Sequence, residues 1–181
     1  MYLEGMFGSM ARRDLKTGES RDIRPGPGPD GKRLRFNWMT PFILSHYDSK
    51  TLYAGANMLF KSENRGDQWK CISPDLSTNP GPERKGNVPF GTITDISESP
   101  LRKGLLYAGT DDGQVHVTKD DGATWTKINK GLPDKWVTRL VASKYGEPTV
   151  FLSLTGYRED DFEKYLYMSN YHSRKAAGEA N

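Results

Sequence analysis

The sequence has almost no cysteine and no long apolar run, and both shortages narrow the kinds of protein it can be. Cys71 is the only cysteine among 181 residues, so no disulfide can form within the chain. No stretch of 18 apolar residues occurs, so no membrane-spanning helix is expected. The first 14 residues lack the basic start and apolar core of a secretory signal peptide. Cys71 follows Trp69 and Lys70 in a strand-like run, where a small packing residue is expected rather than a nucleophile.

The chain also lacks the charge imbalance of a nucleic-acid-binding protein. It carries 26 Lys and Arg residues against 23 Asp and Glu residues. The whole excess lies in residues 1–35, where eight basic side chains face five acidic ones. No stripe of basic residues alternates with aromatic residues. We therefore expect no nucleic-acid partner, and we expect most charged side chains to be solvated.

The sequence motifs of several enzyme and cofactor classes are missing. His46, His116 and His172 are too scattered for a zinc site. No Gly-rich phosphate loop follows a strand-like run, and the Gly-x-Ser-x-Gly pattern of serine hydrolases does not occur. No metal and no cofactor are therefore expected.

What the sequence does contain is an internal repeat. The segment "LYAGANMLFKSENRGDQWKCI", which begins at Leu52, aligns with "LYAGTDDGQVHVTKDDGATWTKI", which begins at Leu106. The Leu-Tyr-Ala-Gly run returns after 54 residues and the Trp after 56. Weaker copies occur at "YLEG" near the start of the chain and at "TVFLSLTGYREDDFEKYLYMS" from Thr149. Such self-similarity indicates an array of equal structural units.

Each repeat is expected to form four short strands. Apolar or alternating runs such as "RFNWMTPFILS", "FGTITDIS" and "WVTRLVAS" precede the units, and Asp112-Gly113 and Lys16-Thr17-Gly18 fit tight hairpins. No segment keeps a 3.6-residue period, so helices should be minor. Four strands in about 50 residues is the size of one β-propeller blade.

The predicted fold class is therefore all-β. We expect a partial β-propeller of three to four antiparallel, four-stranded blades within residues 1–170. The expected blade pieces are about 1–25, 34–73, 90–132 and 136–170.

The repeated turn has a physical explanation that is independent of catalysis. In "TKDDGATW", Asp120 can accept hydrogen bonds from backbone N–H groups inside the turn, and Gly122 supplies a positive φ. The Trp that follows can bury its ring and find a partner for its N–H. The earlier copy keeps Ser, Gly and Trp and has Asn in the Asp position. We predict a structural role for Ser62, Asn64, Gly66, Trp69, Thr118, Asp120, Gly122 and Trp125.

These turns resemble the Asp-box, Ser/Thr-x-Asp-x-Gly-x-x-Trp, of propellers such as sialidases, xyloglucanase-type glycoside hydrolases and the sortilin luminal domain. The order of "GSMARRDLKTGES", "SPLRKGLLYAGTDDGQVHVTKDDGATW" and "LTGYREDDFEKYLYMS" is similar to large bacterial proteins described as sortilin-like or glycosyl-hydrolase-like repeat (BNR) proteins. The resemblance covers about residues 1–170. It implies a secreted or cell-envelope parent protein, and it maps no catalytic motif onto a numbered residue here.

Two departures from this pattern concern the size of the array. Residues 171–181, within "NYHSRKAAGEAN", have neither the Gly nor the Trp of a turn copy and are expected to be an off-pattern tail. Three to four units are also fewer than the 4–8 blades of typical closed propellers. We therefore expect the chain to be a piece of a longer propeller or to self-associate.

Candidate catalytic residues are few. A glycosidase needs two carboxylates roughly 5–10 Å apart. Asp95 lies on an inner-type strand and can face a central channel, whereas Glu159, Asp160 and Asp161 lie in a connection between strands. The alternatives are that Asp95 pairs locally and that the acidic group is a solvated loop. No catalytic residue is assigned.

The longest irregular connection runs from Ser73 to Phe90 and contains four prolines. A connection of this length is usually functional or disordered. Arg84, Lys85 and Asn87 can contact a glycan or a peptide there, and a passive insertion is an equal alternative. The leading functional prediction is a binding scaffold for protein or glycan within a larger protein, without catalysis by this chain alone. The alternative is part of a glycoside hydrolase whose second carboxylate lies outside this sequence.

Overall fold

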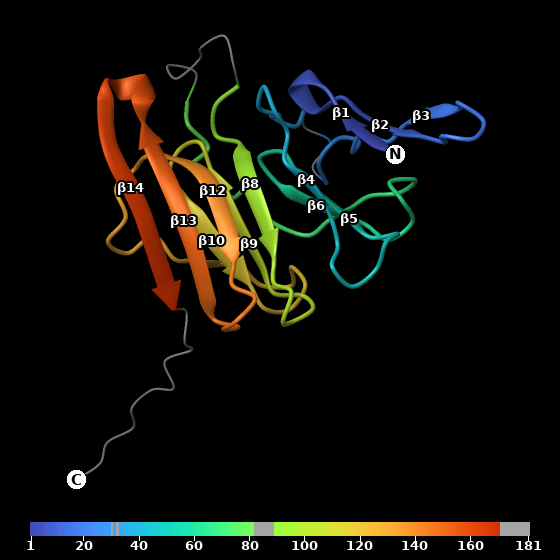
Figure 1. Ribbon diagram of the computed structural model, residues 1–181. Helices are drawn as coiled ribbons and strands as arrows, with labels where there is room; N and C mark the ends of the chain where they lie inside the picture. Colours follow the sequence, from blue (N-terminus) through green and yellow to red (C-terminus); the bar gives the residue numbers. More distant parts are fainter. Residues whose placement is uncertain (30, 32, 82–88, 171–181) are drawn as a thin grey trace.

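The computed structural model describes residues 1–29, 31, 33–81 and 89–170 (Figure 1). Within these residues the strands form four antiparallel sheets that lie side by side, which we name sheets A to D in chain order. Sheet A contains β1 (Tyr2–Glu4), β2 (Met10–Arg13) and β3 (Ser20–Asp22). Sheet B contains β4 (Phe42–Leu44), β5 (Leu52–Gly55), β6 (Leu59–Ser62) and β7 (Lys70–Cys71). Sheet C contains β8 (Ile93–Glu98), β9 (Leu106–Thr110), β10 (Val115–Thr118) and β11 (Thr126–Lys127). Sheet D contains β12 (Trp136–Ala142), β13 (Thr149–Gly156) and β14 (Asp161–Asn170).

The predicted all-β fold class is confirmed. Helical structure in the described residues is limited to two short 3-10 turns, η1 (Met6–Gly8) and η3 (Tyr157–Glu159). Sheets B and C have the four antiparallel strands expected of a blade, in sequential order. Sheets A and D have three strands each within the described part of the chain. No helix in that part is long and apolar enough to cross a membrane.

One expected strand is much shorter than its apolar sequence suggests. The run "RFNWMTPFILS" forms β4 only from Phe42, after Pro41. Proline fixes its own φ, has no N–H for a ladder and restricts the residue before it. Residues 34–40 consequently form no strand, and Arg35 and Asn37 bond instead to Gly91 and Thr92 of the connection between sheets B and C.

Hydrogen-bond registers identify equivalent residues in the four sheets. In each sheet, one residue of the second blade strand pairs with one residue of the third. The equivalent pairs are Tyr2 with Arg12, Tyr53 with Lys61, Tyr107 with Val117, and Phe151 with Met168. The first copy of Leu-Tyr-Ala-Gly is therefore Met1 to Glu4, one residue earlier than the letters "YLEG" suggest.

Three apolar clusters join neighbouring sheets. Met10 of sheet A and Ile23, which follows β3, pack with Leu52 and Phe60 of sheet B. The B–C cluster includes Tyr53, Leu59, Ile93, Ile96 and Leu106. The C–D cluster includes Tyr107, Val115, Val137, Leu140 and Leu152. Each inner sheet thus buries both faces, which is why its second strand, β5 in sheet B and β9 in sheet C, is buried at every position.

The two repeated turns, Ser62–Trp69 and Thr118–Trp125, are named the box turns here. Thr118 Oγ1 accepts a hydrogen bond from the Gly122 N–H at 2.9 Å, and Asp120 Oδ1 accepts one from the Thr124 N–H at 2.8 Å. The Thr124 hydroxyl, the Thr124 N–H and the Thr118 hydroxyl all donate to Asp120 and lower its pKa to about 2. In the earlier turn Ser62 Oγ accepts from the Gly66 N–H at 2.8 Å. The carboxylate therefore serves the turn itself.

The tryptophans of the box turns bind the preceding sheet. Trp69 Nε1 donates to the Ile23 carbonyl and Trp125 Nε1 to the Ile72 carbonyl, both at 2.7 Å. Gly122 has φ 92°, and a Cβ there would lie 2.5 Å from the Ile72 carbonyl oxygen. Glycine is needed at this position both for φ and for close approach. Each box turn thus attaches its own sheet to the sheet before it, and we name this contact the latch.

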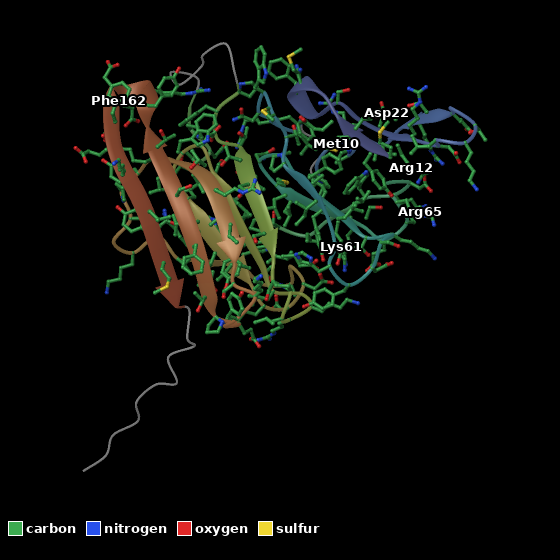
Figure 2. The ribbon with its side chains drawn as sticks, in the orientation of Figure 1. Met10, Arg12, Asp22, Lys61, Arg65 and Phe162 are labelled. Atoms are coloured by element: carbon green, nitrogen blue, oxygen red, sulfur yellow. The ribbon has the colours of Figure 1, made fainter. Side chains whose placement is uncertain are left out.

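Charged side chains strengthen this latch (Figure 2). Arg12 Nη1 donates to the Arg65 carbonyl at 3.0 Å, and its Nη2 lies 3.1 Å from Asp67 Oδ1. The equivalent Lys61 forms an ion pair with Asp121 of the next box turn at 2.5 Å. The cation of one sheet thereby contacts the turn of the sheet that follows.

Candidate binding surface at the crossover end

The antiparallel order divides the loops between two ends of the array. In each sheet the chain leaves the outer strand and crosses to the first strand of the next sheet. Because strand directions alternate, these crossings lie at the same end as the turns between second and third strands. We name this the crossover end; it includes connections 24–41, 72–92 and 128–135. The box turns lie at the opposite end.

A buried polar cluster forms the base of the crossover end. Asp111 Oδ1 accepts hydrogen bonds from the backbone N–H groups of Gly91 and Thr92, at 2.9 and 2.8 Å. Asn37 Nδ2 donates to Asp111 Oδ2 at 3.0 Å and to Thr92 Oγ1 at 2.8 Å. Burial raises the pKa of Asp111 to about 6 in spite of these bonds. The cluster ties two crossings to the β9–β10 turn.

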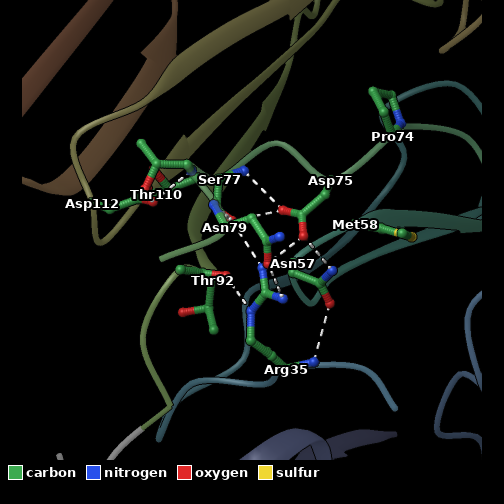
Figure 3. A network of polar contacts seen from close by, with 12 residues as sticks. Arg35, Asn57, Met58, Pro74, Asp75, Ser77, Asn79, Thr92, Thr110 and Asp112 are labelled. Carbon is green, nitrogen blue, oxygen red and sulfur yellow. Dashed lines mark hydrogen bonds and ion pairs between the residues drawn. The ribbon is translucent and has the colours of Figure 1, made fainter. Parts of the chain in front are cut away.

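Arg35 holds both sides of the long connection between sheets B and C (Figure 3). Its Nη2 lies 2.6 Å from Asp75 Oδ2 and 2.9 Å from Ser77 Oγ. Its Nε donates to the Gly91 carbonyl at 3.1 Å, and its Nη1 to Asn79 Oδ1 at 3.1 Å. A guanidinium that bonds to four residues of this connection fixes its two sides as a rigid frame.

A hollow of about 440 Å³ opens beside this frame. It is lined by Phe7, Arg24, Arg33, Leu34, Arg35, Phe36 and Pro89. Arg24 and Arg33 are exposed, whereas Leu34 and Phe36 are buried and form the apolar floor. Arg24 lies over the Phe36 ring at 4.7 Å from its centroid. The hollow therefore combines an apolar floor with guanidinium groups at its rim.

An exposed aromatic pair lies next to the hollow. The rings of Phe7 and Trp38 are 5.4 Å apart and meet edge to face, and the Phe7 N–H donates to the Trp38 carbonyl at 3.2 Å. Phe7 has φ 57°, which is unusual for a residue with a bulky side chain. Trp38 is 48% exposed, and Met6 and Met39 beside the pair in sequence are 56% and 71% exposed. Exposed aromatic groups of this kind are typical of binding surfaces.

The residues predicted to bind ligand lie outside the described residues. Arg84, Lys85 and Asn87 belong to segment 82–88, which the structure does not describe. Pro89, which lines the hollow, follows that segment directly. The sequence reading did not single out Phe7, Arg24 or Trp38. The segment "GKRLRFNWM" carried a signal, because three basic residues are followed there by Phe36 and Trp38 with no acidic residue among them.

Asp95 lies between sheets C and D. Its Oδ2 accepts a hydrogen bond from the Leu140 N–H at 2.5 Å, and Arg139 Nη1 is 3.9 Å from its Oδ1. Burial raises the pKa of this carboxyl, and the Leu140 hydrogen bond opposes the shift. The adjacent Thr94 Oγ1 donates to the Val137 carbonyl at 2.7 Å. The polar side chains of β8 therefore bind the backbone of β12.

The acidic group of the β13–β14 hairpin is held by one lysine. Lys135 Nζ lies 2.7 Å from Glu159 Oε2 and 2.8 Å from Asp161 Oδ2. Tyr165 also donates its hydroxyl to Asp161 at 2.7 Å, and these bonds, with that of Lys135 first, lower the pKa of Asp161 to about 2. Asp160 is exposed and has a left-handed φ of 56°. In the described residues no group of His, Cys, Asp or Glu side chains is arranged to hold a metal ion.

Comparison with known proteins defines the class of fold. No protein-family model and no curated protein matches the sequence. A GH74 xyloglucanase from Xanthomonas campestris matches the structure with a TM-score of 0.61 and 18% identity. The match covers 93% of this chain and 27% of the xyloglucanase chain. The chain is accordingly an array of β-propeller-type sheets that spans about a quarter of the length of that enzyme.

Two further solved structures match with lower TM-scores. YCF48 from Cyanidioschyzon merolae has a TM-score of 0.48 and 12% identity over 76% of this chain and 34% of its own. A GH74 enzyme from Niastella koreensis has a TM-score of 0.35 and 12% identity over 92% of this chain and 37% of its own. At 18% identity the likeness to the Xanthomonas xyloglucanase concerns the fold alone.

Proposed function

We propose that the chain is a binding scaffold of a larger propeller protein and that its ligand, a protein or a glycan, binds at the crossover end. The observation that supports this function is the hollow beside the exposed Phe7–Trp38 pair. Aromatic rings supply large contact areas at low entropic cost, and guanidinium groups recognise carboxylates with two parallel hydrogen bonds. The surface therefore suits a ligand that offers both an apolar face and an acidic group.

The rigid frame makes this end suitable for recognition. Arg35 and Asp111 fix the crossings on which the hollow is built, so little conformational entropy is lost when a ligand binds. Arg84, Lys85 and Asn87 remain part of the proposal because their segment leads into Pro89 at the rim.

Titration of the purified chain tests the proposal. The probes are xyloglucan oligosaccharides, oligogalacturonides, and an acidic aromatic peptide with its neutral amide as control, followed by tryptophan fluorescence and calorimetry. We expect binding of at least one probe, and at least a tenfold loss of affinity in Trp38→Ala. The matched control is Tyr145→Ala, because Tyr145 is 87% exposed in a turn at the opposite end. Equal affinities of the two variants, or no binding of any probe, contradict the proposal.

One observation favours a second candidate function, in which the chain is part of a glycoside hydrolase and supplies one of its two carboxylates. Burial raises the pKa of Asp95, and a general acid needs a raised pKa. The Leu140 N–H occupies one of its oxygens, however, and the side chain is only 12% exposed. Release of reducing ends from xyloglucan, abolished in Asp95→Asn, supports the second candidate over the first.

A further inference from the structure

Each of sheets A, B and C has a face that is turned toward the next sheet along the chain; we name this face, and the equivalent face of sheet D, the forward face. In sheets B and C this face is covered by the strands of the sheet that follows. In sheet D it is the face opposite Val150, Leu152 and Leu154, which belong to the C–D cluster. No described segment of the chain lies on the forward face of sheet D.

The forward face of sheet D carries the same kinds of residue as the covered faces. The registers make Leu166 equivalent to Leu59 and Val115. Their pairing partners, Ser153, Gly55 and Gly109, each lie two residues after the equivalent aromatic residue of the second blade strand. Three positions of the forward face can be compared between the sheets. In sheet B they are Tyr53, Leu59 and Lys61, whose exposed fractions are 1%, 0% and 8%. Those of sheet C are 0%, 0% and 2% exposed, namely Tyr107, Val115 and Val117. Those of sheet D are 41%, 77% and 60% exposed, namely Phe151, Leu166 and Met168.

Two more apolar side chains extend this surface. Val141, which pairs with Phe151, is 49% exposed, and Phe162 of β14 is 77% exposed. Figure 2 shows Phe162 at the edge of the array, away from the other sheets. Five such side chains leave about 500 Å² of apolar surface open, at the upper limit for a typical monomer. A surface of this size indicates an interface.

The polar groups of the forward face also repeat. Thr94 Oγ1 donates both to the Gly109 carbonyl at 3.2 Å and to the Val137 carbonyl of the next sheet at 2.7 Å. The equivalent Thr138 is exposed, and its hydroxyl contacts the Ser153 carbonyl at 3.0 Å and the Ser153 hydroxyl at 2.8 Å, both within sheet D. The position that corresponds to the second contact lies beyond the forward face of sheet D.

We propose that the forward face of sheet D docks a further β-sheet built like sheets C and D. The occupant presents branched aliphatic residues on its first strand, as Ile93 and Ile96 or Val137 and Leu140 do. It places a backbone carbonyl at Thr138 and an acceptor near Arg139, which is 73% exposed. The inference rests on continuity with the chain's own sheet interfaces and is independent of ligand binding at the crossover end.

A second copy of the chain is a poorer occupant. The outward face of sheet A, the only other sheet face open at an end of the array within the described residues, carries Leu3 at 41% exposure. Beside it on that face lie the exposed polar residues Arg13, Ser20 and Asp22. The outward face of sheet A therefore offers far less apolar surface than the faces with which sheets C and D pack against the sheet before them.

The test extends the full chain, through a flexible Gly/Ser linker, by a second copy of residues 91–170. In the unextended chain we expect Leu166→Lys to shift the melting temperature by less than about 1 °C, because the side chain is 77% exposed. In the extended chain the same change in the first copy should lower it by about 5 °C or more, since the lysine would be buried. Leu15→Lys is the matched control, because Leu15 is 73% exposed in the β2–β3 turn.

Three outcomes overturn the proposal. The first is an extended chain in which Leu166→Lys is as neutral as Leu15→Lys. The second is sedimentation of the unextended chain as a dimer that Leu166→Lys dissociates, which assigns the face to a second copy. A second extension, with residues 135–170 alone, guards against misfolding of the first. The third outcome is that the appended strands of both extensions show no protection from hydrogen exchange.

Discussion

Replacement of Tyr53 and of Tyr107 by phenylalanine, one at a time, is expected to change stability in opposite directions. The two tyrosines occupy equivalent positions in sheets B and C, in identical Leu-Tyr-Ala-Gly strands, and both are almost fully buried. Tyr53 donates its hydroxyl to Glu98 Oε1 at 3.1 Å. The hydroxyl of Tyr107 is buried without a hydrogen-bond partner in the described structure.

The next sheet explains the difference. Glu98 pairs with Leu106 in sheet C, and Ala142 pairs with Val150 at the equivalent place in sheet D. Sheet C therefore offers a carboxylate to Tyr53, whereas sheet D offers a methyl group to Tyr107.

The magnitudes follow from the hydrogen bonds. Tyr53→Phe removes a hydrogen bond to a carboxylate and should cost about 1–2 kcal/mol, because Ser45 and His46 still donate to Glu98. Tyr107→Phe removes a hydroxyl whose burial is uncompensated and should stabilise by about 0–1 kcal/mol. Urea unfolding followed by circular dichroism measures both changes, and equal slopes would show that the unfolded states are comparable. The reasoning is refuted if Tyr107→Phe costs as much as Tyr53→Phe.

Two further predictions concern the second box turn and pH. Asp120→Ala should lower the melting temperature by about 2–4 °C through lost turn hydrogen bonds, and Gly122→Val should lower it further, because a Cβ would lie 2.5 Å from the Ile72 carbonyl oxygen; two unchanged melting curves would contradict the latch. Burial lowers the pKa of His116 to about 4 from 6.5, so the unfolded chain binds a proton first as pH falls. Stability should therefore drop by about 2–3 kcal/mol between pH 6.5 and pH 4. The variant His116→Gln should lack that drop in stability. It keeps Asp111, whose raised pKa changes stability in the opposite direction, so the difference between the two proteins reports His116 alone. Parallel pH profiles of the two proteins would disprove the assignment.

The fold class and the units of the array were predictable because they depend on local and repeated signals. The strands of sheets B and C follow directly from the copies at Leu52 and Leu106. The hydrogen bonds inside the box turns also follow from short-range chemistry, since Asp120 bonds to Thr124 and Gly122 supplies a positive φ within eight residues, whereas the contacts with Ile72 do not. The residue at which a strand begins was harder to predict from the sequence, as β4 shows, since it begins only after Pro41.

The candidate site was largely beyond sequence reasoning. Phe7, Trp38 and Arg24 come from different connections, and nothing in their spacing shows that they surround one hollow. Asp95 has the sequence context of a channel-facing carboxylate, yet it binds the Leu140 N–H 45 residues later.

By itself the sequence determined that this chain folds into repeated antiparallel sheets, because alternation, turn residues and the repeat act over a few residues at a time. Only the tertiary structure decided what each repeated residue does. Tyr53 and Tyr107 stand in the same four letters, but one hydroxyl has a partner and the other has none. Leu59 and Leu166 are equivalent in register, but one is buried and the other is 77% exposed. In each pair the difference comes from the neighbouring sheet, whose contacts are made by residues far away in the chain.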